Sequence, residues 1–120
     1  MTEDSSSKHD DAIHLKAIVK CCEDIEYFAE LHGLDLSDIE NDILLQYGYV
    51  FSLTRIGEHV KRLSAELRTG NPGIDWKGLA GLRDVIVHNY EGIDVVRVRS
   101  VIVDDIPPLK SVCLSALSRL

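Results

Sequence analysis

The stretch DILLQYGYVFSLTRIGEHVKRLS, residues 42–64, decides the fold because it carries the longest helical pattern of the chain. Before it, Ser37 is followed three residues later by Glu40, which is a capping-box pattern for the start of a helix. After it, the sequence Gly-Asn-Pro-Gly at 70–73 forces a turn. We therefore expect one helix from Ser37 to about Thr69. The residues at helical spacing on it are Ile39, Ile43, Val50, Leu53, Val60, Ser64 and Leu67. The glycines at 48 and 57 weaken such a helix locally, and they indicate close helix contacts or a bend.

Upstream, a first amphipathic helix is expected from Asp11 to His32, stopped by Gly33. Its apolar stripe is Leu15, Ile18, Cys22, Ile25 and Ala29. Residues 1–10 are polar and read as a flexible N-terminal tail, which leaves residues 11–120 as a single domain. The tail has no apolar signal-peptide core, so we expect a cytoplasmic protein.

Downstream, Asp75 is expected to cap a third helix that ends at Glu91-Gly92. The β-branched run at 95–103 fits a strand, but its apolar residues also form a helical stripe. We expect a fourth helix here, capped by Asp94. A fifth should open at Asp105, because the prolines that follow are tolerated in a first turn. The predicted fold is all-α, an up-and-down bundle of four to five helices.

Composition limits the partners. The formal net charge of −7 argues against a broad basic face that grips nucleic acid, although a local basic cleft on an acidic body remains possible. Lys61, Arg62 and Arg68 are either a solvated face or an RNA contact. No apolar run approaches the ~18 residues of a membrane span. The three cysteines lack metal-site spacing and are expected to be buried thiols, so neither metal nor cofactor is expected.

The candidate site is the octapeptide at 83–90, RDVIVHNY. Arg83 keeps its positive charge, and a guanidinium can donate two parallel hydrogen bonds to phosphate oxygens. His88 changes protonation near neutral pH and can move protons. On a regular helix Arg83 and His88 lie about 140° apart around the axis, so the two side chains cannot both face one small target. Either the helix end distorts near His88, or a second chain completes the site.

Neighbouring polar residues are candidates for support. Asp84 lies four residues before His88, on the same face of a continuous helix, and could orient the ring. Asn89 could hold a reacting oxygen. Glu58, in the segment RIGEH, is either a supporting residue or a solvated carboxylate. Tyr90 is either a core aromatic or a functional phenol. Trp76 is expected to anchor the start of its helix.

Three segments, read in order, resemble the HepT-like toxins among the HEPN-domain ribonucleases. They are residues 42–64, the stretch NPGIDWKGLAGLRDVIVHNYEGID at 71–94, and DIPPLK at 105–110. The R-x4-H-x-Y spacing of Arg83, His88 and Tyr90 matches the family signature. The resemblance implies a HEPN-like helical fold, supports the helix at 95–103, and implies a homodimer that brings two motifs into one cleft.

The same resemblance implies a metal-independent endoribonuclease, the toxin of a toxin–antitoxin pair, with Arg83 and His88 as catalytic residues. Its implied partners are RNA and a small nucleotidyltransferase antitoxin that transfers AMP to Tyr90; no DNA or membrane partner is expected. An alternative is a non-catalytic helical HEPN module that binds the nucleotidyltransferase or a nucleotide. A purely structural dimerisation bundle is a third possibility.

Overall fold

The computed structural model describes the backbone of residues 2–88 and 92–120, and within these ranges the side chains from Lys8 onward. This part of the chain forms eight helices and one short antiparallel pair of strands, so the all-α prediction is confirmed. The helices are α1 (Thr2–His32), α2 (Leu36–Glu40), α3 (Ile43–Lys61), α4 (Ala65–Thr69), α5 (Trp76–Ala80), α6 (Leu82–Ile86), α7 (Val95–Asp104) and α8 (Ile106–Ser118). The strands are β1 (Val87–His88) and β2 (Gly92–Ile93).

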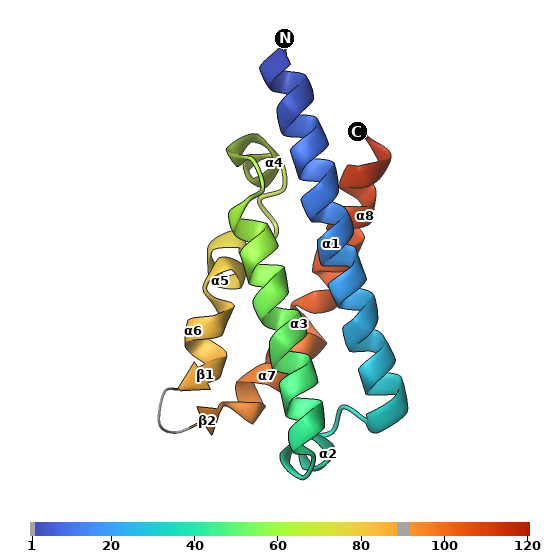
Figure 1. Cartoon of the computed structure of the whole chain (residues 1–120), viewed down its shortest axis with the longest axis vertical. Helices are drawn as coiled ribbons and strands as arrows, with labels where there is room; N and C mark the ends of the chain where they lie inside the picture. The colour runs from blue at the N-terminus through green and yellow to red at the C-terminus, as the bar shows by residue number, and fades with distance from the viewer. Residues whose placement is uncertain (1, 89–91) are drawn as a thin grey trace.

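The long helices alternate in direction (Figure 1). Helix α1 runs down the molecule, α3 returns beside it, α5 and α6 descend on the far side of α3, and α8 climbs behind α1. This is the up-and-down plan that the sequence predicts, although there are more and shorter helices than the four or five expected. None of the helices in the described ranges is both long and apolar enough to cross a membrane.

Helix α1 buries the stripe predicted for it, with Leu15, Ile18, Cys22 and Ile25 almost inaccessible to solvent. Gly33 follows with φ of +97°, a left-handed conformation that ends the helix where the sequence predicts. The helix begins at Thr2 rather than Asp11, so its backbone includes residues assigned to a tail. The proposed domain boundary after residue 10 stays a prediction.

The single helix predicted over 37–69 is wrong, because the structure breaks it into α2, α3 and α4. Asp42 caps α3, its carboxylate accepting from the backbone N–H of Leu45 at 3.1 Å. Ser64 caps α4 in the same way through Leu67, also at 3.1 Å, and receives support from the buried carboxylate of Asp11. Short polar side chains that satisfy free N–H groups favour a new helix start over continuation.

The third predicted helix is also wrong beyond Ile86. Helices α5 and α6 meet at Gly81, and the chain then turns extended at Val87 with φ −117° and ψ 113°. Strand β1 pairs with β2 in the register Val87 opposite Ile93 and His88 opposite Gly92. The carbonyl of Ile86 accepts from the N–H of Asp94 at 2.9 Å, a bond that fixes the helix end against the start of α7.

The last two helices form as predicted. Helix α7 covers the ambiguous run at 95–103 and buries Val98, Val101 and Ile102 on one face. Asp94 caps it through the N–H of Arg97 at 3.0 Å. Helix α8 opens with its prolines in the first turn.

The core lies where α1, α3 and α8 meet, and α5 closes it from the other side of α3. Trp76 is buried there and donates its indole N–H to the carbonyl of Asn71 at 2.9 Å, which confirms it as an anchor. A Cβ at Gly57 would stand 2.8 Å from the carbonyl oxygen of Leu79, so this glycine allows close packing of α3 on α5. All three cysteines are buried free thiols, as predicted, and burial raises the pKa of Cys22 and of Cys113 to about 12.

Candidate functional site

Arg83 projects into solvent from α6, whose buried residues Leu82 and Ile86 hold the helix against the core. No described carboxylate lies within ion-pair distance, 4.0 Å, of its guanidinium. The side chain therefore presents a free permanent cation on a well-anchored short helix, which is the arrangement that suits contact with a phosphate.

His88 lies two residues beyond the end of α6, in strand β1. Its partner in the register is Gly92, whose φ of +86° is a left-handed conformation that glycine adopts at little cost. Of the two solutions to the angular mismatch between Arg83 and His88, the structure has the first: the helix breaks before His88.

The imidazole of His88 has an acidic neighbour that the sequence analysis assigned only as a helix cap. Its Nε2 lies 3.6 Å from Oδ2 of Asp94, within ion-pair distance when the ring is protonated. The other carboxylate oxygen of Asp94 accepts from the N–H of Arg97, and its backbone N–H binds the carbonyl of Ile86. Asp94 is thus held at three points, and it can orient the ring of His88.

The predicted supporting residues are placed differently. Asp84 is exposed on α6, and the argument that it shares a helical face with His88 fails because the helix ends at Ile86. Glu58 is exposed on α3 and lies 3.4 Å from the ammonium of Lys61. Roles for both at the site stay predictions. Asn89 and Tyr90 lie outside the described residues.

A pair of histidines in contact was not predicted from the sequence. His14 on α1 and His59 on α3 place their Nδ1 atoms 3.0 Å apart, so one ring donates and the other accepts. Burial lowers the pKa of His59, and His14, Arg55 and Arg62 lower it further, while Glu58 acts in the opposite direction. The two residues are 45 apart in the chain, so spacing carried no signal.

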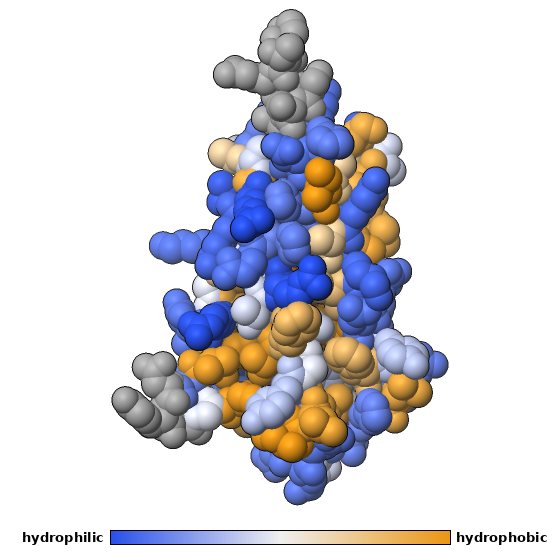
Figure 2. All heavy atoms as spheres, viewed as in Figure 1, coloured by the Kyte–Doolittle hydropathy of each residue, from blue (hydrophilic) through white to orange (hydrophobic). Residues whose placement is uncertain are grey.

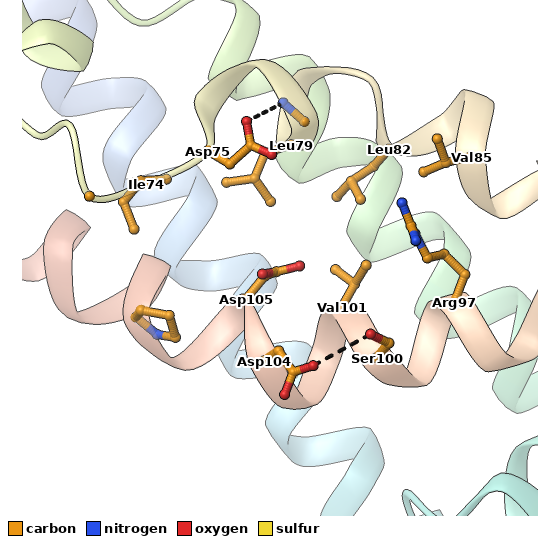
Figure 3. Close-up of a pocket in the computed structure, with 13 residues that line it drawn as sticks. Ile74, Asp75, Leu79, Leu82, Val85, Arg97, Ser100, Val101, Asp104 and Asp105 are labelled. Atoms are coloured by element: carbon orange, nitrogen blue, oxygen red, sulfur yellow. Dashed lines mark hydrogen bonds between the residues drawn. The ribbon is translucent and has the colours of Figure 1, made fainter.

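A cavity of about 400 Å³ separates α5 and α6 from α7 and the start of α8. Figure 3 shows the carboxyl groups of Asp75, Asp104 and Asp105 around it, with Arg97 reaching across from α7 toward Val85. Loss of hydration, with repulsion from Asp104 and Asp75, raises the pKa of Asp105. Such an acidic lining repels phosphate, so the cavity is no extension of an RNA site. Among the described residues, no three His, Cys, Asp or Glu gather closely enough to hold a metal.

Comparison with known proteins gives one family match. The model of the family described as "Ribonuclease HepT-like" matches residues 18–116, which include α3, the octapeptide and most of α8. No solved structure matches this chain.

Curated relatives point the same way. "Putative RNase MJ1380" of Methanocaldococcus jannaschii is 28% identical over 104 residues, 87% of this chain and 94% of the relative. "Putative RNase TTE0752" of Caldanaerobacter subterraneus subsp. tengcongensis is 33% identical over 97 residues, 81% and 85% of the two chains. "Probable ribonuclease HepT" of Thermococcus cleftensis is 31% identical over 97 residues, which are 81% of this chain and 86% of the relative.

Proposed function

Because the chain belongs to the Ribonuclease HepT-like family, we propose that it is an endoribonuclease that cleaves RNA with Arg83 and His88. The main structural support for this assignment is the geometry at the end of α6. The helix ends before His88, so the imidazole stands beside the fixed carboxylate of Asp94 while Arg83 stays free on α6. A proton-transfer group and a permanent cation on adjoining elements are the two parts that phosphodiester cleavage needs.

In the proposed reaction, the RNA 2′-hydroxyl attacks the adjacent phosphorus. The new bond joins the 2′-oxygen to phosphorus, the bond from phosphorus to the 5′-oxygen breaks, and the products are a 2′,3′-cyclic phosphate and a 5′-hydroxyl. His88 takes the proton of the 2′-hydroxyl as base or supplies the proton to the 5′-oxygen as acid. Arg83 stabilises charge that builds on the phosphoryl oxygens. Asp94 orients the imidazole for this proton transfer.

A homodimer is part of the proposal, and an exposed apolar face supports it. The face lies over the lower half of α3 and α1 in Figure 2, and its large exposed members are Tyr27, Leu31, Ile43, Leu44, Tyr47 and Phe51. Together they expose on the order of 700 Å², taking roughly 200 Å² for each side chain. This is close to the ~800 Å² that each partner contributes to a standard interface, and larger than the usual patch on a monomer.

Control by a small nucleotidyltransferase antitoxin is the regulatory part of the proposal, and it rests on the family resemblance of the R-x4-H-x-Y motif. The enzyme would transfer AMP to the hydroxyl of Tyr90, two residues beyond His88. The added bulk and negative charge would exclude RNA from the cleft. The toxin role of the chain belongs to the same proposal.

The second candidate function is a non-catalytic helical module that binds the nucleotidyltransferase or a nucleotide. The net charge of −7 favours it, because a ribonuclease must attract a polyanion. Cleavage assays on variants of the motif separate the two functions.

The test compares RNA cleavage by wild type, His88→Ala and Arg83→Ala. Each variant should lose activity by a factor on the order of 10²–10³, the cost of a lost charge-stabilising donor, while helical circular dichroism is unchanged. His9→Ala and Arg119→Ala are matched controls, because both replace exposed side chains outside the site. Full activity in His88→Ala would overturn the role of His88, whereas no cleavage by the wild-type protein would favour the non-catalytic module.

A further inference from the structure

Charge is distributed unevenly along the chain. Residues 23–42 hold eight of the twenty Asp and Glu residues and no Lys or Arg. Residues 55–83 hold six of the thirteen Lys and Arg residues and only three acids. The first segment forms the end of α1 and all of α2, at the bottom of Figure 1, while the second occupies the upper α3 and the side formed by α4, α5 and α6. An anionic ligand is therefore drawn to the second region.

An open groove of about 520 Å³ lies in this region, between α4 and α5. Its apolar lining comes from Ala65, Ala80 and the buried ring of Trp76. Its two charged residues are both basic: Arg68 from α4 and Lys77 from α5. We call it the Arg68–Lys77 groove.

The two cations of the groove are available to a ligand. Within residues 8–88 and 92–120, no carboxylate lies within 4.0 Å of Arg68 or Lys77. The Nε of Arg68 points back to the carbonyl of Ser64 at 3.5 Å, which leaves the outer guanidinium nitrogens free for a phosphate. Two acids stand close to these cations in sequence. Glu66 is exposed on α4 and is not among the residues that line the groove. Asp75 lines the cavity on the other side of α5 and caps that helix through the N–H of Gly78.

The groove and the candidate catalytic site lie on consecutive elements of the chain. Lys77 on α5 precedes Arg83 on α6 by six residues, and the two short helices meet at Gly81. Helices α4, α5 and α6, to which Arg68, Lys77 and Arg83 belong, follow one another along one side of the molecule (Figure 1).

We propose that the Arg68–Lys77 groove binds the sugar–phosphate backbone of single-stranded RNA and leads the strand to Arg83 and His88. This inference rests on the proposed ribonuclease function. The groove supplies phosphate contacts without base readout, so it positions RNA and does not select a sequence. It also explains how a protein of net negative charge holds its substrate, since residues 55–83 carry twice as many basic residues as acidic ones.

The test measures RNA binding without cleavage. The full chain carries His88→Ala, and the probe is a fluorescein-labelled single-stranded RNA of mixed sequence, about 12 nucleotides long. Fluorescence anisotropy gives the Kd over a range of salt concentrations. In the Arg68→Gln/Lys77→Gln double variant, affinity at low salt should fall about tenfold or more, and the slope of log K against log salt should flatten by about 1.4, at ~0.7 per phosphate contact.

The matched control is Lys16→Gln/Arg119→Gln, which removes the same charge from exposed residues on the α1 and α8 side of the molecule and should keep the slope. Thr69→Glu is a second groove variant that leaves both cations in place and should weaken binding by repulsion. If both groove variants bind RNA like the control, the proposal is overturned, and the groove becomes a candidate binding surface for a protein partner.

Cleavage by the chain with His88 intact is measured separately. A groove effect without cleavage would refute the ribonuclease alone, and cleavage without a groove effect would refute the groove alone.

Discussion

At Asp94, three interactions meet on one residue: a backbone bond to Ile86, a cap on α7, and the approach to His88. The sequence allowed prediction of the cap, because an aspartate stands directly before a helical pattern. It did not allow prediction of the approach to His88, which depends on the turn from β1 to β2. Gly92 was the available signal for that turn, and it was interpreted as the end of a helix.

Asp94→Asn separates the two roles of this residue, because Asn also caps helices well. We expect kcat for RNA cleavage to fall roughly 10- to 100-fold, by analogy with the loss of a partner that orients a metal-binding histidine, while KM stays nearly unchanged. Thermal stability should change little. Asp42→Asn is the control, since it makes the same replacement at the cap of α3. A loss of stability with unchanged kcat would leave Asp94 only a structural role.

Arg83 and His88 are predictable at the residue scale because their chemistry and spacing are visible in the sequence. Their geometry is not, because it depends on where α6 ends. Val87 is β-branched and adopts extended backbone, and Asp94 takes the free carbonyl of Ile86. The bond from Asp94 involves the chain beyond residue 91, so a pattern read along the helix alone missed it.

At the scale of elements, the apolar pattern gave the right buried faces and the wrong boundaries. The periodic pattern runs on through Asp42 and Ser64, yet helices end just before both. Each side chain caps the helix that follows, and Ser64 gains two further bonds from Asp11, 53 residues away. Capping of this kind competes with continuation of the preceding helix. A contact between residues so distant in sequence, such as Asp11 and Ser64, is not visible in a helical pattern.

Gly57→Ala tests the close contact between α3 and α5. Alanine favours the helix by about 1 kcal/mol, but its Cβ would meet the backbone carbonyl of Leu79 at 2.8 Å. Overpacking against backbone costs about 1–3 kcal/mol, so we expect net destabilisation in urea unfolding. Gly48→Ala is the control: its Cβ would meet only the ring of Phe28, at 3.3 Å, and a side chain can shift. Equal stability of the two variants would contradict the contact.

The histidine pair between α1 and α3 predicts a pH effect on stability. The pKa of His59 is lowered by burial and by His14, so the folded state favours the neutral ring. As pH falls through the ordinary value near 6.5, the unfolded chain takes up a proton that the folded chain resists, and stability declines. Replacing the ring in His59→Gln should reduce the loss of stability between about pH 7.5 and 5.5. His9→Gln, which changes an exposed histidine, should not. An identical pH dependence in all three proteins would refute this role.

At the scale of the whole molecule, acidic and basic regions are separated, and an apolar face covers the lower half of α3 and α1. The sequence permits counting of the charges, and the net charge of −7 argued against a broad basic face that grips nucleic acid. Only the fold shows that residues 23–42 lie away from the side that carries Arg68, Lys77 and Arg83. We infer that one molecule combines a basic path for RNA with an apolar face for a second copy.

The central claim is that this chain cleaves RNA through the 2′-hydroxyl, using its own side chains. The most direct test compares an RNA cut by the wild-type protein with the same RNA carrying hydrogen in place of the 2′-hydroxyl at the cut site, both in EDTA. We expect the first RNA to be cleaved to a 2′,3′-cyclic phosphate end and the second to remain uncut at that site. Cleavage of the 2′-deoxy substrate at the same position, or complete loss of activity in EDTA, would contradict this claim.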